Sequence, residues 1–310
     1  MKGKRDNIFM INGILNVYKE KGFTSHDVVA KLRGILHQKK IGHTGTLDPD
    51  AEGVLPICLG TATKLCDMLT DKSKTYHTVF KLGVVTDTQD ITGTVQEENA
   101  VVCTEQQILD TIMSFVGKYE QVPPMYSAKK VNGKKLYEYA REGKVVERKA
   151  CSVIIHSIEQ IEVNLEKNEI SMDVSCSKGT YIRTLCHDIG QQLGCGACML
   201  SLLRTKVSTF CIKDSLSLEK IQLLQEKGEL LSYVYSPEQV LGEFSSIKVL
   251  EKGDKLLYNG NALPKNLLAP MQEVSTEQVR VYDSKGKFVA IYGWDRDKKQ
   301  YKPVKMFLEQ

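Results

Sequence analysis

Strand-like and helix-like segments follow one another in this 310-residue chain without a regular strand–helix–strand alternation. Two β-rich runs, 152–163 and 169–177, are separated only by 164–168, which predicts a hairpin. Residues 53–60 and 74–83 also have strand patterns, the second with Tyr76, Thr78, Phe80 and Leu82 on one face. Helices are expected over 24–39, 61–71, 104–119, 134–143 and 180–194. This order favours an α+β fold with a mixed, largely antiparallel sheet and flanking helices.

The composition changes near residue 240. Residues 213–243 have the pattern of helices and connectors, and short strands dominate from about Ser245. Residues 279–293 predict a hairpin that turns near Ser284–Gly286. We therefore expect a large domain over 1–240 and a small β-barrel over 245–310.

Composition excludes several protein classes. No stretch approaches the roughly 20 apolar residues of a membrane helix, and Asn12 and Asn16 interrupt the apolar N-terminal stretch, so a buried strand is predicted there instead of a signal peptide. The nine cysteines are scattered, which is typical of reduced thiols in a cytosolic protein. Cys195 and Cys198 form a C-x-x-C without a second pair of ligands, so no zinc site is expected. The net charge of +4 permits an anionic partner.

The segment KIGHTGTLDPDAEGVLPICLG (40–60) concentrates His43, two threonines and Asp48 before an apolar run. It lacks the G-x-x-x-x-G-K-[ST] pattern of a phosphate-binding loop. Three alternatives stay open for Asp48: a turn residue, a metal ligand together with Asp50 and Glu52, or a nucleophile. A nucleophilic carboxylate must stay ionised and rigid, which calls for an arginine partner.

A candidate arginine lies in CSKGTYIRT (176–184). Tyr181 and Arg183 stand at the start of the predicted helix, and Asp90 of TDTQDITG is a second acid that could hold the guanidinium. Alternatively, Tyr181 is a core residue and Arg183 a surface charge.

Aromatic and basic residues are compatible with RNA. The rings of Tyr76 and Tyr126 can stack on unpaired bases. One group of cations lies in the segment beside Tyr126: Lys129, Lys130, Lys134, Lys135, Arg141 and Lys144. A second group is dense among the expected C-terminal strands: Lys285, Lys287, Arg296, Lys298, Lys299, Lys302 and Lys305. Each group can bind a phosphate backbone, or can simply be a solvated face.

Five motifs together resemble one enzyme family. They are GHTGTLDPDAEGVLP, TYHTVFKLGVVTDTQDITG, QVPPMYSAKKVNGKKLYEYAREG, SKGTYIRTLCHDIGQQLGCGA and VRVYDSKGKFVAIYG. In this order, and over nearly the whole chain, they are similar to the TruB-type tRNA pseudouridine synthases of bacteria, which act on uridine 55 of the tRNA T-arm. The resemblance implies a catalytic domain over 1–240 with an RNA-binding insertion at about 104–150, and a PUA-like RNA-binding barrel over 245–310.

The resemblance also implies the chemistry. Asp48 would attack the target nucleotide, most simply at the ribose anomeric carbon, while Arg183 pairs with Asp48 and Asp90. Tyr76 would stack on the base and serve in the later removal of the proton at carbon 5, and His43 would support the gap left by the flipped uridine. The remaining implied site residues are Lys19 in the floor, Tyr181 and Leu202 in the pocket wall, and Tyr126 and Lys130 in RNA binding. Neither a cofactor nor a metal is implied, and a cytoplasmic monomer is expected.

Four departures from the family pattern affect RNA contacts more than chemistry. Glu20 replaces a proline, Cys198-Met199 replaces the usual A-H-L, Leu203 replaces the first arginine of L-R-R-T, which leaves Arg204, and Cys151 replaces an arginine. Two other functions stay open: an RNA-binding chaperone, and a guide-RNA-dependent relative. The intact Asp48, Tyr76 and Arg183 argue against the first. Such relatives usually carry extra terminal extensions, and no long basic tail is found between the expected barrel and residue 310, so we expect the second less.

Overall fold

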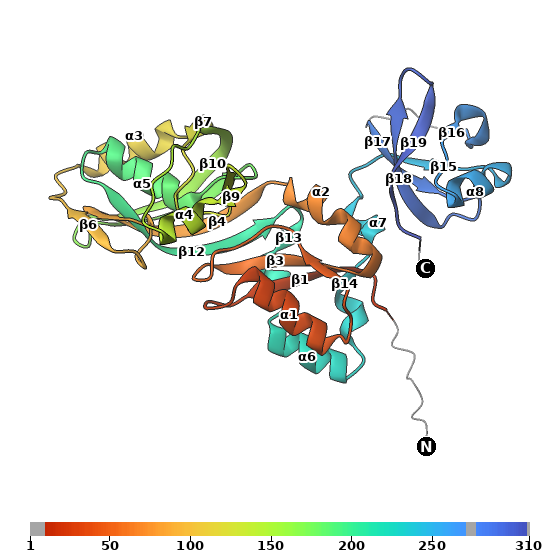
Figure 1. Ribbon diagram of the computed structural model, residues 1–310, viewed down its shortest axis with the longest axis horizontal. Helices are drawn as coiled ribbons and strands as arrows, with labels where there is room; N and C mark the ends of the chain where they lie inside the picture. The colour runs from red at the N-terminus through yellow and green to blue at the C-terminus, as the bar shows by residue number, and fades with distance from the viewer. Residues whose placement is uncertain (1–9, 271–276, 309–310) are drawn as a thin grey trace.

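A large mixed sheet forms the body of the protein (Figure 1). The computed structural model describes residues 10–270 and 277–308. The main path of the sheet is β14-β1-β3-β12-β4-β11-β10-β7; β2 pairs with β3, and β13 with β12. Only the β3–β12 pair is parallel among these pairings of the described residues. The strands are β1 Gly13–Lys19, β2 Ile41–His43, β3 Glu52–Leu59, β4 Lys74–Leu82, β7 Gly117–Gln121, β10 Cys151–Asn164, β11 Glu169–Cys176, β12 Ala197–Val207, β13 Phe210–Cys211 and β14 Val234–Tyr235.

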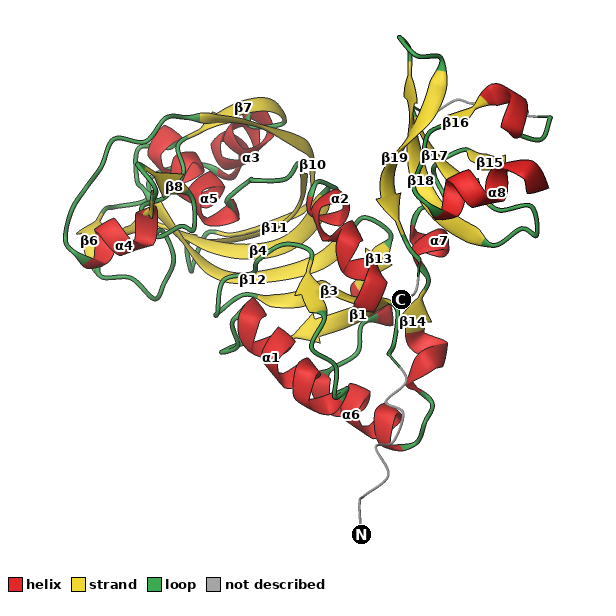
Figure 2. Ribbon diagram, turned by 45° about the vertical axis from the view of Figure 1, so that its right-hand side comes forward, coloured by secondary structure: helices red, strands yellow, loops and turns green. Residues whose placement is uncertain are grey.

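Helices cover the two halves of this sheet separately. α1 and α6 pack together against β1 and β3, whereas α3 and α5 pack on the half that contains β4, β10 and β11 (Figures 1 and 2). The helices are α1 Ser25–Ile35, α2 Cys66–Thr70, α3 Glu105–Ser114, α4 Leu136–Arg141, α5 Ile182–Gln192, α6 Leu218–Glu226 and α7 Pro237–Val240. Short two-stranded sheets are formed by β5 Val84–Thr86 with β6 Val95–Glu98, and by β8 Lys130–Val131 with β9 Lys134–Lys135. The predicted α+β class is thus confirmed.

Local sequence signals explain the helix boundaries. Thr24 caps α1 through a reciprocal pair with Asp27, and Thr104 caps α3 in the same way with Gln107. The structure differs from the single helix expected over 61–71, because Gly60–Leu65 is a 3-10 helix and α2 follows it. The side chain of Asn12 accepts a hydrogen bond from the Thr61 amide there, so this end is capped by a distant residue that the local pattern does not reveal.

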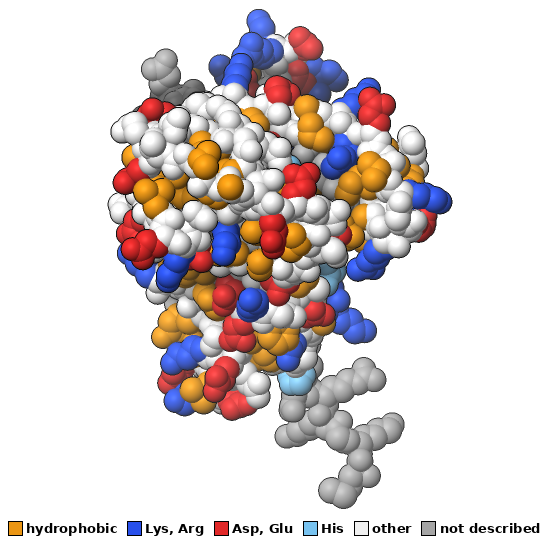
Figure 3. Space-filling model, turned by 90° about the vertical axis from the view of Figure 1, so that its left-hand side faces the viewer, with side chains coloured by type: hydrophobic (Ala, Val, Ile, Leu, Met, Phe, Trp, Pro, Cys, Tyr) orange, Lys and Arg blue, Asp and Glu red, His pale blue; other side chains and the backbone are white. Residues whose placement is uncertain are grey.

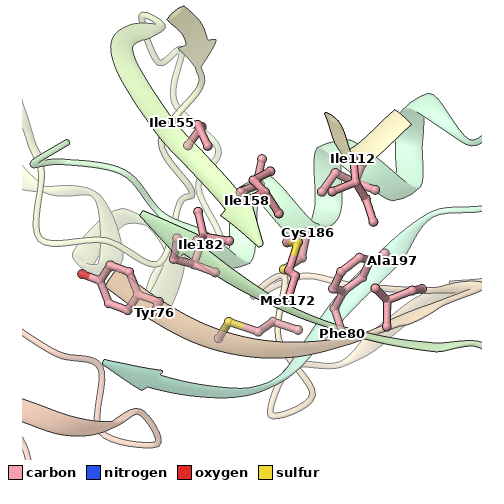
Figure 4. Packing of buried hydrophobic residues seen from close by; sticks show 14 of the residues in the cluster. Tyr76, Phe80, Ile112, Ile155, Ile158, Met172, Ile182, Cys186 and Ala197 are labelled. Atoms are coloured by element: carbon pink, nitrogen blue, oxygen red, sulfur yellow. The ribbon is translucent and has the colours of Figure 1, made fainter. Parts of the chain in front are cut away.

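The alternation predicted in β4 places the apolar core. Tyr76, Thr78, Phe80 and Leu82 are buried on one face, and the buried Lys74 begins this row. In Figure 4, Tyr76 lies at the edge of the cluster, and its hydroxyl points away from Phe80 and Met172. The core therefore holds the ring of Tyr76 while the polar end faces the edge of the site.

The C-terminal segment forms a second, curled sheet with the order β15-β17-β18-β19-β16. Its elements are β15 Ser246–Lys248, α8 Glu251–Tyr258, β16 Leu263–Pro264, β17 Gln278–Tyr282, β18 Phe288–Asp295 and β19 Gln300–Met306. The predicted hairpin is confirmed as β17–β18, and the half-barrel fits the expected PUA-like fold. The sequence did not predict α8, because only Gly253 and Leu257 of this charged helix are buried.

The second sheet is packed against the first. Ile291 and Phe307 belong to one buried cluster with Leu65 and Leu69, and Lys305 forms an ion pair with Asp67 of α2. The domain boundary at 240–245 stays a prediction, and the N-terminal residues 1–9 and the terminal residues 309–310 lie outside the described residues. Within the described ranges, no helix has the length and apolar character needed to cross a membrane.

Candidate active site

The Asp48 loop connects β2 to β3 and is held from the side of β1 and α1. The buried ammonium of Lys19 donates hydrogen bonds to the carbonyl oxygens of Pro49 (3.0 Å), Phe23 (2.6 Å) and Glu20 (3.1 Å). The amide of Leu47 donates to the hydroxyl of Ser25 at 3.0 Å. The side chain of Asp48 is nevertheless 46% exposed, so a fixed backbone presents an accessible carboxylate.

Arg183 lies in the first turn of α5 and joins three segments. Its Nη2 is 3.2 Å from Oδ2 of Asp48 and donates to the carbonyl of Tyr126 at 2.6 Å. Its Nη1 is 3.4 Å from Oδ2 of Asp90. Only 7% of the Arg183 side chain is exposed, so these ion pairs form at the buried edge of the site. The alternative of a surface arginine is therefore wrong.

Asp90 is itself fixed by its own loop. Its Oδ1 accepts hydrogen bonds from the Thr88 hydroxyl at 2.8 Å and from the Thr92 amide at 3.0 Å. Gln89 has a φ of 68°, and its side chain accepts a hydrogen bond from the Thr184 hydroxyl of α5 at 2.7 Å. This link between the loop and α5 was missed by sequence reasoning, since it depends on a contact between residues 95 positions apart.

Tyr76 is buried and faces Arg204 across the β4–β12 register. Burial raises the pKa of the Tyr76 phenol, whereas the guanidinium of Arg204 acts in the opposite direction. Arg204 is almost completely buried, and burial lowers its pKa. Nearby Lys74 is also buried, and burial lowers its pKa to about 8. Arg204 is therefore a buried cation that acts directly on the phenol.

His43 lies at the end of β2, and its ring meets that of His26 edge to face at 5.3 Å. Burial is the main cause that lowers the pKa of His43, and the charges of His26 and Arg204 add to it. The ring is thus predominantly neutral near pH 7, which suits a residue that contacts bases. Its buried Nδ1 has no hydrogen-bond partner among the described residues.

The other predicted site residues have contacts of different kinds. Tyr181 precedes α5, and its backbone exchanges two hydrogen bonds with the side chain of Gln121. Leu202 packs against the cluster that contains Tyr76. Tyr126 reaches Arg183 only through its carbonyl, and its hydroxyl donates to Asp87 at 3.4 Å. Lys130 is exposed in β8.

Three of the residues that depart from the family pattern are accommodated in the fold. Glu20 still supplies a carbonyl to Lys19, Cys198 is fully buried in β12, and Cys151 contacts the ammonium of Lys129. Neither the C-x-x-C nor the acids near Asp48 belong to a group of three or more potential metal ligands in the described part of the chain. Asp48 instead has an arginine partner.

Comparison with known proteins agrees with this geometry. A model described as TruB family pseudouridylate synthase (N terminal domain) matches residues 33–182, and one described as tRNA pseudouridylate synthase B C-terminal domain matches residues 183–241. A protein named tRNA pseudouridine synthase B from Lachnoclostridium phytofermentans is 52% identical over 96% of this chain and 100% of its own length. A protein of the same name from Clostridium perfringens is 46% identical over 97% of this chain and 100% of its own length.

The chain belongs to the TruB family of pseudouridylate synthases. This confirms the predicted family and class of enzyme. Solved structures extend the likeness of the fold: one titled "Crystal Structure of a Cbf5-Nop10-Gar1 Complex" has a TM-score of 0.72 at 24% identity, with 96% of this chain and 85% of that chain covered. One titled "Structure of H/ACA RNP bound to a substrate RNA containing 2'-deoxyuridine" has a TM-score of 0.71 at 22% identity, with the same coverage.

Proposed function

We propose that this protein converts uridine 55 in the T-arm of tRNA into pseudouridine, without a guide RNA, and that Asp48 is the nucleophile. The observation that carries the proposal is the chain of ion pairs from Asp48 through Arg183 to Asp90, with Tyr76 in the same TruB-family site. The names of the relatives, which refer to tRNA, support the choice of substrate. The reaction also implies a cytoplasmic protein, and we expect a monomer.

The accessible carboxylate of Asp48 can approach a ribose carbon while the ion pair with Arg183 fixes its orientation. Attack at the anomeric carbon breaks the glycosidic bond. The uracil leaves with the electron pair on its N1 and turns. Its carbon 5 then bonds to the anomeric carbon as the bond between that carbon and Asp48 breaks, which frees the carboxylate. Tyr76 removes the proton that remains at carbon 5. These steps involve carboxylate, phenol and guanidinium groups that the chain itself provides.

The target base must leave the folded T-arm before this reaction. Extrusion of a base costs a few kcal/mol, which stacking on the Tyr76 ring can offset. The neutral ring of His43 is suited to support the gap, and Tyr181 and Leu202 form the wall of the pocket. The exposed Lys130 contacts the phosphate backbone.

The surface supports recognition by shape instead of by charge alone. Figure 3 shows a face on which Lys and Arg side chains are interspersed with Asp and Glu. Several C-terminal cations are also paired within the protein: Lys302 with Asp295, and Lys305 with Asp67. Free cations such as Lys130, Lys298 and Lys299 are therefore the better candidates for phosphate contacts.

The lone protein should convert a bare T-arm stem-loop, and chemical mapping of pseudouridine should find one modified uridine at the position that corresponds to 55. Conversion only after addition of a guide RNA would contradict guide-independence. Binding without conversion under any of these conditions would favour an RNA chaperone.

A further inference from the structure

Arg204 is a buried charge that the ion pairs of the site do not explain. Only 1% of the residue is exposed, and it is among the largest fully buried residues of the described chain. None of the ion pairs formed within residues 10–270 and 277–308 includes Arg204. Because desolvation of an arginine is costly, a buried guanidinium without a carboxylate needs another compensating role.

The contacts of Arg204 connect three parts of the site. Nε donates to the carbonyl of Val54 in β3 at 2.7 Å, and Nη2 donates to the carbonyl of Gly45 at 3.3 Å. Gly45 belongs to the loop that carries Asp48. The third contact is with Tyr76, which pairs with Arg204 in the register of the neighbouring strands β4 and β12. The Tyr76 phenol lies against the Arg204 guanidinium.

Two glycines make this arrangement possible. A Cβ at Gly53 would lie 2.2 Å from the carbonyl oxygen of Arg204, so a side chain would separate β3 from β12. A Cβ at Gly45 would lie 3.9 Å from both Nη1 of Arg204 and Cε of Lys74. The side chains of Arg204 and Lys74 therefore both approach the Asp48 loop at Gly45.

The groups that face Tyr76 differ in their effect on its phenol. Burial raises the pKa of Tyr76, and the thiol of Cys176 and the carboxylate of Asp48 act in the same direction. Cys176 is neutral near pH 7, because burial raises its pKa to about 11. Among the groups that act on the Tyr76 phenol, Arg204 is the one that favours the negative form.

We propose that Arg204 is a positioning residue for Tyr76, whose guanidinium holds the phenol beside the Asp48 loop and stabilises the phenolate that accepts the proton from carbon 5 of the uracil. This inference rests on the proposed function. In this step the phenolate oxygen forms the new O–H bond while the C–H bond at carbon 5 breaks. The electron pair of that bond returns to the uracil ring, and the phenol later releases its proton to water.

A purely structural role makes a different prediction. If Arg204 only held Gly45 and Val54, its loss would lower the rate by the same factor at every pH. If it stabilises the phenolate, the loss depends on pH, because each unit of pH increases the small phenolate fraction about tenfold.

The test compares wild type, Arg204→Met and Arg204→Lys by single-turnover release of tritium from carbon 5 of a T-arm stem-loop between pH 6 and 10. Arg33→Met, which changes an exposed arginine of α1, is the matched control. We expect Arg204→Met to lose at least about tenfold in rate at pH 7, to recover at alkaline pH, and to show a larger isotope effect at carbon 5. Arg204→Lys should lose less.

A second measurement uses 3-fluorotyrosine at position 76, which has a more acidic phenol. It should restore part of the rate of Arg204→Met or Arg204→Lys at pH 7, and a structural defect would not respond in this way. Arg204→Lys alone carries the test if Arg204→Met does not fold, as judged by thermal melting and stem-loop binding.

A uniform loss at every pH without recovery by fluorotyrosine would overturn the inference and leave the proposed function intact. Full activity of Tyr76→Phe would also overturn the inference, because no phenolate would then be needed. Absence of tritium release by the wild type would instead refute the proposed function.

Discussion

Arg183→Met should destabilise the protein far more than Asp48→Asn does, whereas both substitutions should abolish turnover. Arg183 and Asp90 have side chains that are 7% and 16% exposed, whereas Asp48 is 46% exposed. Removal of one partner from a buried ion pair costs about 3–5 kcal/mol, because the other charge stays buried without compensation. Loss of a half-exposed pair costs about 0–1 kcal/mol.

We therefore expect Arg183→Met to lower the free energy of unfolding by about 3–5 kcal/mol, and Asp48→Asn by less than about 1 kcal/mol. Both variants should lose turnover, the first because Asp48 loses its partner and the second because the nucleophile is gone. Urea denaturation followed by circular dichroism gives the stability, and single-turnover conversion of a T-arm stem-loop gives the rate.

A double-mutant cycle makes the prediction sharper. The coupling energy between Arg183 and Asp90, measured with Arg183→Met and Asp90→Asn, should be about 1.5–3 kcal/mol. The coupling between Arg183 and Asp48 should be below about 1 kcal/mol. Wild-type stability of Arg183→Met, or the reverse order of the two couplings, would refute the view that Arg183 is anchored by Asp90 and presents Asp48.

Three further outcomes are expected. Lys19→Met should lower the free energy of unfolding by at least about 2 kcal/mol in urea denaturation, because three carbonyl groups lose a buried donor, while Lys21→Met at an exposed neighbour changes it little. Burial lowers the pKa of Lys74 from 10.5 to about 8, so its buried ammonium destabilises the fold below pH 8, and this cost disappears as the pH rises to 10.5. The free energy of unfolding, measured by denaturation at pH 7.5 and 9.5, should therefore rise less for Lys74→Met than for wild type. An equal rise in both proteins would contradict this. Lys298→Glu with Lys299→Glu should weaken binding of full-length tRNA more than of the stem-loop and reduce its salt dependence; an equal loss for both RNAs would show that the C-terminal domain does not reach beyond the T-arm.

Local chemistry explains which parts of the fold were predictable. The capping residues Thr24 and Thr104 and the alternation in β4 are determined by neighbours in sequence, and they predicted the starts of α1 and α3 and the buried face of Tyr76. The end of the helix expected over 104–119 was wrong, because Gly117–Gln121 is strand β7. Helix α8 was missed because it is short and charged, and only Gly253 and Leu257 of it are buried. The 3-10 helix at Gly60–Leu65 was missed because its end is capped by the distant Asn12.

In the site, too, local motifs could be recognised from the sequence, whereas contacts between distant residues could not. The acid loop and the candidate Arg183 can be found as motifs, and the resemblance to the family paired them. Arg204 and Tyr76 are 128 positions apart in the chain, and they meet because of the register between β4 and β12. Neither motif alone determines that register. The link from Gln89 to Thr184 is of the same kind.

The central claim is that Asp48 is the nucleophile in the isomerisation of one uridine. The most direct measurement is release of tritium from a T-arm stem-loop labelled at carbon 5 of its uridines, with wild type, Asp48→Asn and the exposed neighbour Asp50→Asn compared at equal RNA binding. We predict release from a single uridine by wild type and Asp50→Asn, and none by Asp48→Asn. Appreciable release by Asp48→Asn, or none by wild type bound to the RNA, would contradict the account.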